Sequence, residues 1–383
     1  MRSSGRCKVQ RLLRVFVLAL AVAAVEAIEL KPDGYHIFPG ENIQDAIELA
    51  AENRTNKSVK VHAGVYAPRA KRQALIWLNR AHDGVRIEAV GAVTLTAANP
   101  ELSNPKFRTH PAVVNHVVYF GDGISSNTML RGFRITGANA YVTDKFMTQI
   151  EPDKTVPKNS FFLTDGGAIK IFGRSFPVLE DLEIVDNYTT PCGGGISVQH
   201  QGFNTQFVVM RDCIFRNNRA QVTGAAVDLL EGSSARLINC LLVENASNLG
   251  VDVVARRSGE APFTNSGALT VFPGSRAIVE NCTFTANRNG VDDMSGAGTY
   301  RNCIFYKNTV EIGLPGGRYE LDLPRGGTVE NCFIAGKVID PQKVVAAGKN
   351  VLNAPDPNFA KDFAPQAAEY SEVGYRPISR AAR

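Results

Sequence analysis

Short segments with the same order of residue types recur along this chain. They are LRGFRI (130–135), LEDLEI (179–184), MRDCIF (210–215), LINCLL (237–242), VENCTF (279–284), YRNCIF (300–305) and VENCFI (329–334). Each begins with a large residue, usually continues with a charged one, and has apolar residues or cysteine at its fourth and sixth places. The copies are 21 to 49 residues apart, a spacing that indicates a solenoid of stacked turns.

The third place of each copy holds a residue that tolerates a left-handed backbone. These residues are Gly132, Asp181, Asp212, Asn239, Asn281, Asn302 and Asn331. We expect each to bend the chain between two short strands, whose alternate side chains then point inward. The stacked asparagines of this column are also expected to share side-chain amide hydrogen bonds from turn to turn.

A second asparagine follows three residues after the sixth place in most copies, and it predicts a second bend. The residues are Asn187, Asn218, Asn245, Asn287 and Asn308. A third strand is predicted upstream of the first bend, in GAIKIFGRSFPVLEDL (167–182), AAVDLLEGSSARLINC (225–240) and GALTVFPGSRAIVENC (267–282). Three short strands per turn, stacked at roughly 4.8 Å, make a parallel β-helix.

The two ends of the chain differ from the repeats. ENIQDAIELAAEN (41–53) has one apolar stripe and predicts a helix capped by Asn42, which would cover the end of the core. We divide the chain into a capping segment (28–58), the coil (59–355) and an irregular tail (356–383). Two inserts, 138–165 and 246–266, interrupt the coil.

The repeated NCxF and GGAI-like units resemble those of right-handed parallel β-helix proteins of the pectin lyase-like superfamily, over most of residues 36–360. The resemblance implies an all-β fold. It is a right-handed, single-stranded parallel β-helix, a solenoid with three short strands per turn, with an N-terminal capping helix.

Composition and charge add the cellular context. Residues 1–27 combine five basic residues with the apolar run VFVLALAVAAV, which is typical of a signal peptide and predicts a secreted, periplasmic or cell-surface protein. Without them the chain has 37 basic and 36 acidic residues, a balance that does not favour nucleic acid as a partner. No later segment is long and apolar enough to span a membrane, and we expect a monomer.

Six cysteines follow the signal segment, and five of them occupy the fourth place of the repeat. These five are Cys213, Cys240, Cys282, Cys303 and Cys332. Residues at one inward position on neighbouring turns have parallel side chains, an arrangement that suits packing better than the near-perpendicular torsion of a disulfide. The pattern therefore predicts free thiols.

Both inserts leave the coil just before the third strand, so they either wall a groove on its outer face or merely extend the surface. Alternation places Lys170, Ser197 and Asp228 on that outer face, while Ile169, Ile196, Val227 and Leu269 point inward. Candidate substrate-binding residues are Phe172, Ser197, Gln199, His200, Arg256 and Arg257.

The resemblance suggests what such a groove would do. In β-helix polysaccharide lyases a basic residue removes the proton next to a uronate carboxylate, which a calcium ion or a second basic residue neutralises. Lys170 and Asp228 are the candidate catalytic residues, and Asp165 and Asp228 are the candidate ligands of Ca²⁺. The alternative is that Lys170 and Asp228 are an ordinary solvated pair. Asp292 and Asp293 lie beside Gly290, but no complete calcium-binding motif surrounds them.

Two functions remain open. One is a secreted, lyase-like or epimerase-like enzyme that acts on an acidic polysaccharide, which the groove favours. The other is a non-catalytic structural or adhesive wall or matrix protein with a rigid binding surface. The second is favoured because the sequence shows no convergent charged cluster.

Overall fold

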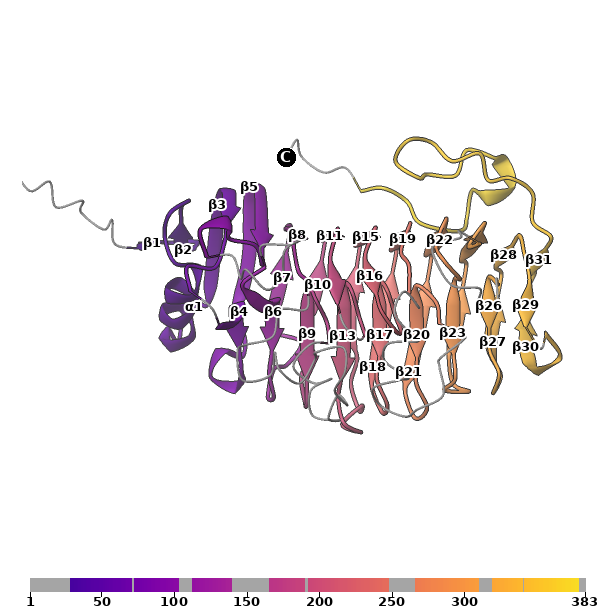
Figure 1. Ribbon diagram of the computed structural model, residues 1–383, viewed down its shortest axis with the longest axis horizontal. Helices are drawn as coiled ribbons and strands as arrows, with labels where there is room; N and C mark the ends of the chain where they lie inside the picture. The colour runs from indigo at the N-terminus through magenta and orange to yellow at the C-terminus, as the bar shows by residue number, and fades with distance from the viewer. Residues whose placement is uncertain are drawn as a thin grey trace, which may run out of the picture.

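The computed structural model describes residues 28–70, 72–102, 112–139, 165–189, 192–247, 266–309, 319–339 and 341–378. The chain winds into an elongated coil whose successive turns lie side by side, from β1 and β2 at one end to β29, β30 and β31 at the other (Figure 1). The candidate signal segment 1–27, Arg256 and Arg257 all lie outside the described residues.

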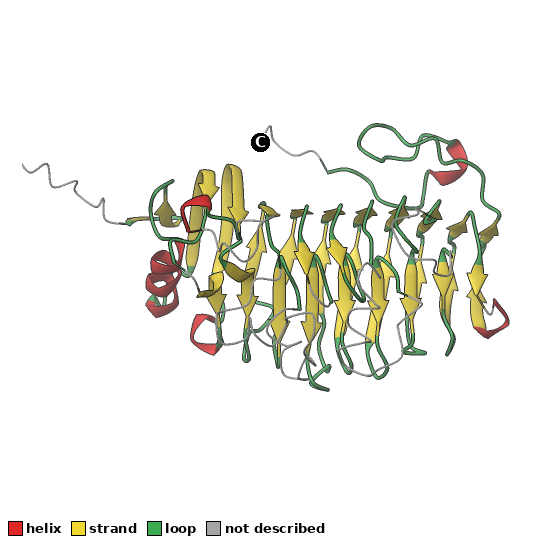
Figure 2. Ribbon diagram, viewed as in Figure 1, coloured by secondary structure: helices red, strands yellow, loops and turns green. Residues whose placement is uncertain are grey.

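Parallel strands make up nearly all of the regular structure (Figure 2). The larger sheet has 20 strands: β1 (Glu29–Lys31), β2 (Gly34–Ile37), β3 (Ser58–Tyr66), β5 (Arg86–Thr96), β7 (Met129–Arg131), β8 (Arg134–Thr136), β10 (Val178–Glu180), β11 (Glu183–Val185), β14 (Val208–Arg211), β15 (Ile214–Arg216), β18 (Ser234–Ile238), β19 (Leu241–Val243), β21 (Arg276–Glu280), β22 (Thr283–Thr285), β24 (Thr299–Arg301), β25 (Ile304–Tyr306), β27 (Gly327–Glu330), β28 (Phe333–Ile334), β30 (Val344–Ala347) and β31 (Val351–Leu352).

A second sheet has nine strands: β4 (Arg72–Leu78), β6 (Val114–Phe120), β9 (Ile169–Phe172), β13 (Ile196–Gln199), β17 (Val227–Leu229), β20 (Leu269–Val271), β23 (Val291–Asp293), β26 (Leu321–Asp322) and β29 (Val338–Ile339). A two-stranded sheet pairs β12 (Tyr188–Thr189) with β16 (Arg219–Ala220). The helical elements are α1 (Ile43–Glu52) and the short 3-10 turns η1 (Arg80–His82), η2 (Pro100–Leu102), η3 (Pro341–Lys343) and η4 (Ala368–Tyr370). The prediction of a right-handed parallel β-helix is confirmed.

The first bend of each turn is where the sequence places it. Asp181, Asp212, Asn239, Asn281, Asn302 and Asn331 have φ values between 52° and 56°, and Gly132 has a φ of 87°. Each lies between two strands of the larger sheet, such as β21 and β22 around Asn281. One left-handed residue per turn therefore bends the chain between two strands.

The second bend differs from the prediction by one residue. The left-handed residues are Asp186, Asn217, Glu244, Ala286 and Lys307, with φ between 53° and 59°. The asparagine that follows each of them points inward and is buried. The bend turns the next side chain towards the interior, so the left-handed residue and the inward amide occupy consecutive positions.

These inward asparagines form the amide ladder that was expected at the first bend. Asn187 Nδ2 donates to Asn218 Oδ1 at 3.1 Å, and the same contact continues through Asn245, Asn287 and Asn308 at 3.1, 2.9 and 2.7 Å. The last amide of the ladder, that of Asn308, donates to the buried carboxylate of Glu320. At the first bend one contact of this kind joins neighbouring turns, since Asn239 Nδ2 donates to Asp212 Oδ1 at 2.6 Å.

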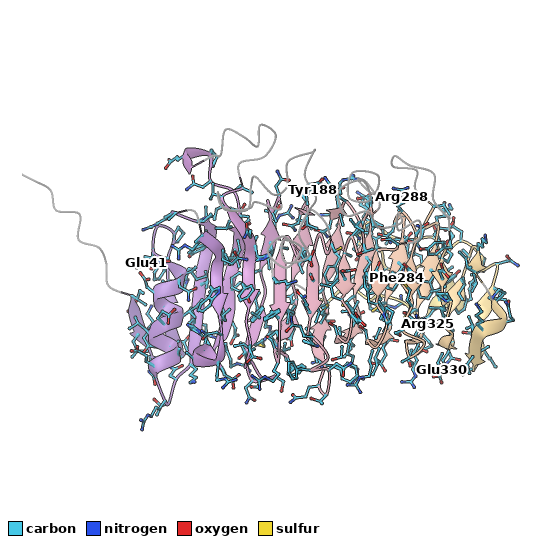
Figure 3. The ribbon with its side chains drawn as sticks, turned by 60° about the horizontal axis from the view of Figure 1, so that its bottom comes forward. Glu41, Tyr188, Phe284, Arg288, Arg325 and Glu330 are labelled. Atoms are coloured by element: carbon cyan, nitrogen blue, oxygen red, sulfur yellow. The ribbon has the colours of Figure 1, made fainter. Side chains whose placement is uncertain are left out.

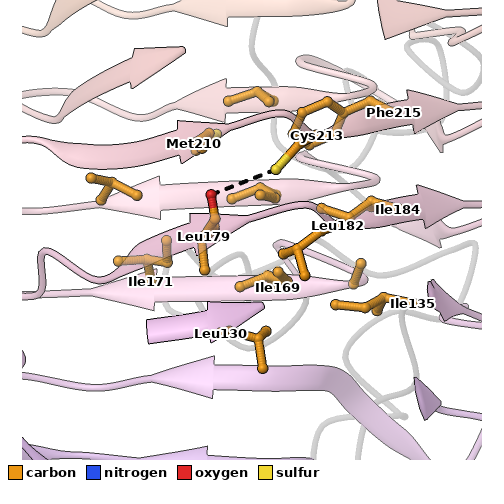
Figure 4. Close-up of a cluster of buried hydrophobic side chains, with 14 of the residues drawn as sticks. Leu130, Ile135, Ile169, Ile171, Leu179, Leu182, Ile184, Met210, Cys213 and Phe215 are labelled. Atoms are coloured by element: carbon orange, nitrogen blue, oxygen red, sulfur yellow. Dashed lines mark hydrogen bonds between the residues drawn. The ribbon is translucent and has the colours of Figure 1, made fainter. Parts of the chain in front are cut away.

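The six cysteines of the described chain are buried free thiols, as predicted. Cys213 packs against Leu182 and Phe215 in the coil interior, where its Sγ faces Leu179 O at 3.6 Å (Figure 4). Neighbouring turns also meet through sulfur, since Cys240 N donates to Cys282 Sγ at 3.3 Å. Cys192 is outside this column and is also buried.

The two ends of the coil are covered differently. Helix α1 buries Ile43, Ala46, Ile47 and Ala50 against the first turns, and the Asn42 side chain caps it by accepting from Gln44 N. The tail does not cover the far end but returns along the outer face of the larger sheet (Figure 1). Gly374 N donates to Asn302 O at 2.8 Å, and Arg376 N donates to Asn239 Oδ1 at 2.7 Å.

We predict that Asn281→Leu destabilises the fold by about 1–3 kcal/mol, because a branched residue is strained at a φ of 53°. Glu280 forms ion pairs with Arg236 at 2.7 Å and with Arg301 at 3.6 Å. Because such surface pairs are weak, Glu280→Leu should cost less than about 1 kcal/mol. Urea denaturation of both variants measures the difference. Equal free energies of unfolding would contradict the assignment of the bend.

The ladder makes a separate prediction. Asn245→Ala removes the donor to Phe215 O and Val243 O and the acceptor of the Asn218 backbone N–H, whereas the Asn218 side-chain amide keeps Ile184 O as an acceptor. Several buried groups then lack partners at about 1–3 kcal/mol each, so we expect a loss of more than about 3 kcal/mol. The control is Asn204→Ala, which changes a half-buried residue on a loop. It should change the free energy of unfolding little. The same denaturation series tests both variants.

Candidate functional site

A column of polar side chains runs along the outer face of the nine-stranded sheet. The register pairs Lys170 with Ser197, Ser197 with Asp228, Asp228 with Thr270, Thr270 with Asp292, and Asp292 with Asp322, across β9, β13, β17, β20, β23 and β26. The residues before them in each strand, beginning with Ile169 and Ile196, belong to the hydrophobic core. The predicted inward and outward positions are therefore confirmed, and we call this row the polar column.

The polar column is not exposed to solvent, however. Lys170, Ser197, Asp228 and Thr270 each have 0% of their surface exposed, and Phe172 and Gln199 are half-buried. The alternative of an ordinary solvated pair at Lys170 and Asp228 is thus wrong. Alternation along a strand reveals which face a side chain is on, but it carries no information about what lies over that face.

Lys170 brings several of the predicted residues together. Its Nζ donates to Ser197 Oγ at 3.2 Å and to Gln199 Oε1 at 2.9 Å, and it lies 3.6 Å from Asp165 Oδ2. Burial lowers the pKa of Lys170, whereas the charges of Asp165 and Asp228 act in the opposite direction. A lysine whose pKa is lowered in this way loses its proton at a lower pH than a lysine at the surface.

The two predicted carboxylates, Asp165 and Asp228, both have raised pKa values. Burial raises the pKa of Asp165 to about 6, against the opposing influence of Lys170. Burial, and then the charge of Asp165, raise the pKa of Asp228 well above its ordinary value. Thr223 lies close enough to lower the pKa of Asp228 in part, yet neither carboxylate oxygen of Asp228 makes a well-formed hydrogen bond. Asp228 therefore keeps its proton to a higher pH than an exposed aspartate does.

His116 on β6 is a site residue that the sequence reasoning missed. Its Nδ1 donates to Gly166 O at 2.6 Å, while its buried Nε2 has no partner. Burial lowers the pKa of His116 to about 3, and the charge of Lys170 acts in the same direction. The ring is therefore neutral, with an unused lone pair. The available signal was the polar pair Asn115 and His116 inside the otherwise apolar strand VNHVVYF.

The other end of the column is acidic. Burial raises the pKa of Asp292 well above its ordinary value, and Asp322, Asp293 and Asp228 raise it further. The Tyr319 hydroxyl is buried without a hydrogen-bond partner, and burial and both of the carboxylates Asp292 and Asp322 raise its pKa. Asp293 is different, because it points into the coil and accepts a hydrogen bond from Tyr300 at 2.8 Å.

Among the described residues, Arg288 is a cation whose charge lowers the pKa of Tyr319 in part. It lies with Tyr188 along one edge of the coil, whereas Glu330 lies along the opposite edge (Figure 3). Its guanidinium donates to Ser247 O at 3.0 Å. Burial and three neighbouring carboxylates are the causes of the raised pKa of Asp292.

Three further predictions about the site have different outcomes. His200 is buried, donates from Nε2 to Ser175 O at 2.8 Å and accepts at Nδ1 from Ser234 N at 3.2 Å, which leaves no ring nitrogen for a substrate. Within the described residues, no group of three or more His, Cys, Asp or Glu side chains is arranged to hold a metal ion. Calcium binding by Asp165 and Asp228 therefore stays a prediction, as does substrate binding by Arg256 and Arg257.

The protonation of His116 can be tested through stability. The unfolded chain binds a proton at His116 below pH 6.5, whereas the folded chain does so only near pH 3, so acid favours unfolding in that interval. Between pH 6.5 and pH 3, we expect the free energy of unfolding of the parent to fall by at most about 5 kcal/mol more than that of His116→Asn. Asparagine keeps a donor for Gly166 O. Urea denaturation at stepped pH measures this, and parallel pH profiles of the two proteins would contradict it.

Comparison with known proteins agrees with this fold. The family model described as the right handed beta helix region matches residues 83–266, which include Lys170, Asp228 and His116. No curated protein and no solved structure matches the chain. Among the residues that the structure describes, no helix is long and apolar enough to cross a membrane. The match and the stacked parallel strands together identify residues 83–266 as part of a right-handed β-helix, which the structure extends in both directions.

Proposed function

We propose that this protein binds an extended acidic polysaccharide along the polar column and moves a proton on one of its uronate units, as a lyase or an epimerase does. The observation that carries the proposal is the set of unused polar atoms beside Lys170. Among the described residues, no well-formed hydrogen bond reaches either oxygen of Asp228, Nε2 of His116 or Oδ1 of Asp165, and all of these atoms are buried. Each such group costs free energy, and a bound ligand that pairs with it removes that cost.

The chemistry follows from the protonation states. Removal of the proton next to a carboxylate requires a base, and also a donor that stabilises the charge that develops on the carboxylate. Protonated Asp228 is such a donor, since a neutral carboxylic acid gives a hydrogen bond to an oxyanion. Lys170, with its lowered pKa, and neutral His116 are the two groups that accept and return the proton.

The shape of the column supports a polymer rather than a small substrate. Lys170 and Asp322 are five strand spacings apart in the register, roughly 24 Å along the coil axis. A polysaccharide that lies parallel to the axis would meet each strand in turn. The basic end at Lys170 suits a uronate carboxylate, whereas the acidic end at Asp292 and Asp322 suits hydroxyl groups.

The alternative function is a non-catalytic wall or matrix protein whose coil is a rigid binding surface. One observation favours it: Lys170 and Asp228 are completely buried, so a substrate must first gain access to them. For either function we propose export from the cell, which rests on the composition of residues 1–27.

The test is Lys170→Met, which removes the charge and keeps most of the volume. On a panel of uronate polymers we expect this variant to lose about 10²–10⁴-fold in turnover, the range of general acid–base catalysis. Ultraviolet absorbance detects an unsaturated product, and incorporation of deuterium from solvent detects epimerisation. Lys349→Met, at an exposed lysine, is the matched control and should keep the parent turnover.

Three outcomes are informative. Equal turnover of Lys170→Met and the parent would show that the polar column is not the site. Binding of a polymer by the parent without turnover would favour the non-catalytic alternative. Absence of both binding and turnover across the panel would remove the polysaccharide proposal. Thermal melting of each variant separates a loss of function from a loss of fold.

A further inference from the structure

Two histidines face each other at the N-terminal end of the coil, away from the polar column. His36 lies on β2 opposite Lys60 of β3, and His62 is two residues further along β3 on the same outer face. His36 Nδ1 and His62 Nε2 are 2.8 Å apart. Two imidazole nitrogens therefore point at the same small volume between neighbouring strands.

A carboxylate fixes the orientation of the first ring. Asp33 Oδ1 lies 2.9 Å from His36 Nε2. Since ionised Asp33 only accepts, His36 Nε2 carries the proton and Nδ1 presents its lone pair to His62. A carboxylate behind a histidine in this way is the usual outer partner of a metal-binding imidazole.

The second ring is also held in place. The Phe38 ring stacks on His62 with their centroids 4.2 Å apart and their planes 9° apart. Phe38 N donates in turn to Glu41 Oε2 at 2.6 Å, near the start of α1 (Figure 3).

We propose that His36 Nδ1 and His62 Nε2 bind one divalent transition-metal ion, such as zinc, nickel or copper, with water in the other positions. Imidazole ligands suit these metals. Two nitrogens at about 2.05 Å from a tetrahedral ion are about 3.3 Å apart, so the rings must separate by about 0.5 Å. His62 moves its proton from Nε2 to Nδ1 through solvent, and the number of bound protons does not change.

The surrounding charges permit a cation. Lys31 pairs with Glu29 at 3.0 Å and Lys60 pairs with Glu88 at 3.3 Å, so the two nearby lysines are offset by carboxylates. Only two protein nitrogens converge here, in keeping with the lack of any three-residue metal group in the described chain. The ion would join β2 to β3, the first parallel strand pair behind the helical cap.

Isothermal titration of the full chain with Zn²⁺ and, separately, Ni²⁺ at neutral pH tests the proposal. We expect one site in the parent, a loss of at least tenfold in affinity for His62→Ala, and a loss of about 10- to 100-fold for Asp33→Asn. His82→Gln is the matched control. His82 also has a carboxylate partner, Glu48 at 2.9 Å, but no second histidine faces it, so its replacement should not change the affinity.

Ring ¹⁵N shifts of the histidines provide a second measurement that a purely structural role would not affect. Zinc should shift His36 Nδ1 and His62 Nε2 and leave the His116 and His200 nitrogens in place. The proposal is overturned if the parent binds neither ion at millimolar concentration, or if His62→Ala binds as tightly as the parent. Unchanged thermal melting of His62→Ala in the absence of metal would show that this variant folds.

Discussion

The first bend in each turn of this coil depends on a single residue that holds the left-handed backbone region between two short strands. Because a side chain in that region is normally strained, glycine, asparagine and aspartate fill the first bend almost everywhere. The bend determines which side chains of the next strand point inward and which point outward, and the inward ones form the core. The cysteine column, the amide ladder and the polar column all follow from it, because a slip of one residue would exchange inward and outward positions.

Because the strands pair in parallel and in register, equivalent residues of successive turns lie in columns. One residue per turn occupies each column, so polar side chains that are 22 to 42 residues apart in sequence become neighbours at a single strand spacing. The titratable groups at Lys170, Asp228, Asp292 and Asp322 are aligned in this way. Burial lowers the pKa of Lys170 and raises the pKa values of Asp228 and Asp292.

Much of the fold was predictable from the sequence, because the repeat reports backbone conformation directly. Asn281 and Asp212 have a residue type that their φ demands, and Cys282 and Cys303 occupy a position that only the interior explains. The ladder was expected at the first bend, where Asn239 and Asp212 form one such contact, but the continuous ladder lies at the second bend. Residue type alone does not distinguish an amide that tolerates a bend from one that points inward after it. Ala286 and Glu244 at the second bend show that the left-handed position there is not restricted to the residues that favour it.

The site was less predictable for a physical reason. Alternation gave the face of Lys170, Ser197 and Asp228 correctly, but burial depends on what covers a face, and His116 joins them only through the stacking of turns. By contrast, the ladder from Asn187 to Glu320 has a direction, since each asparagine amide donates one hydrogen to the next side chain towards the C-terminal end and the Glu320 carboxylate accepts the last one. A duplicated turn inserted within the ladder would find an identical donor and acceptor on each side, which would allow such a protein to lengthen by whole turns. A turn added at Glu320 would meet a carboxylate instead, so Glu320 ends the ladder although the coil continues to β31.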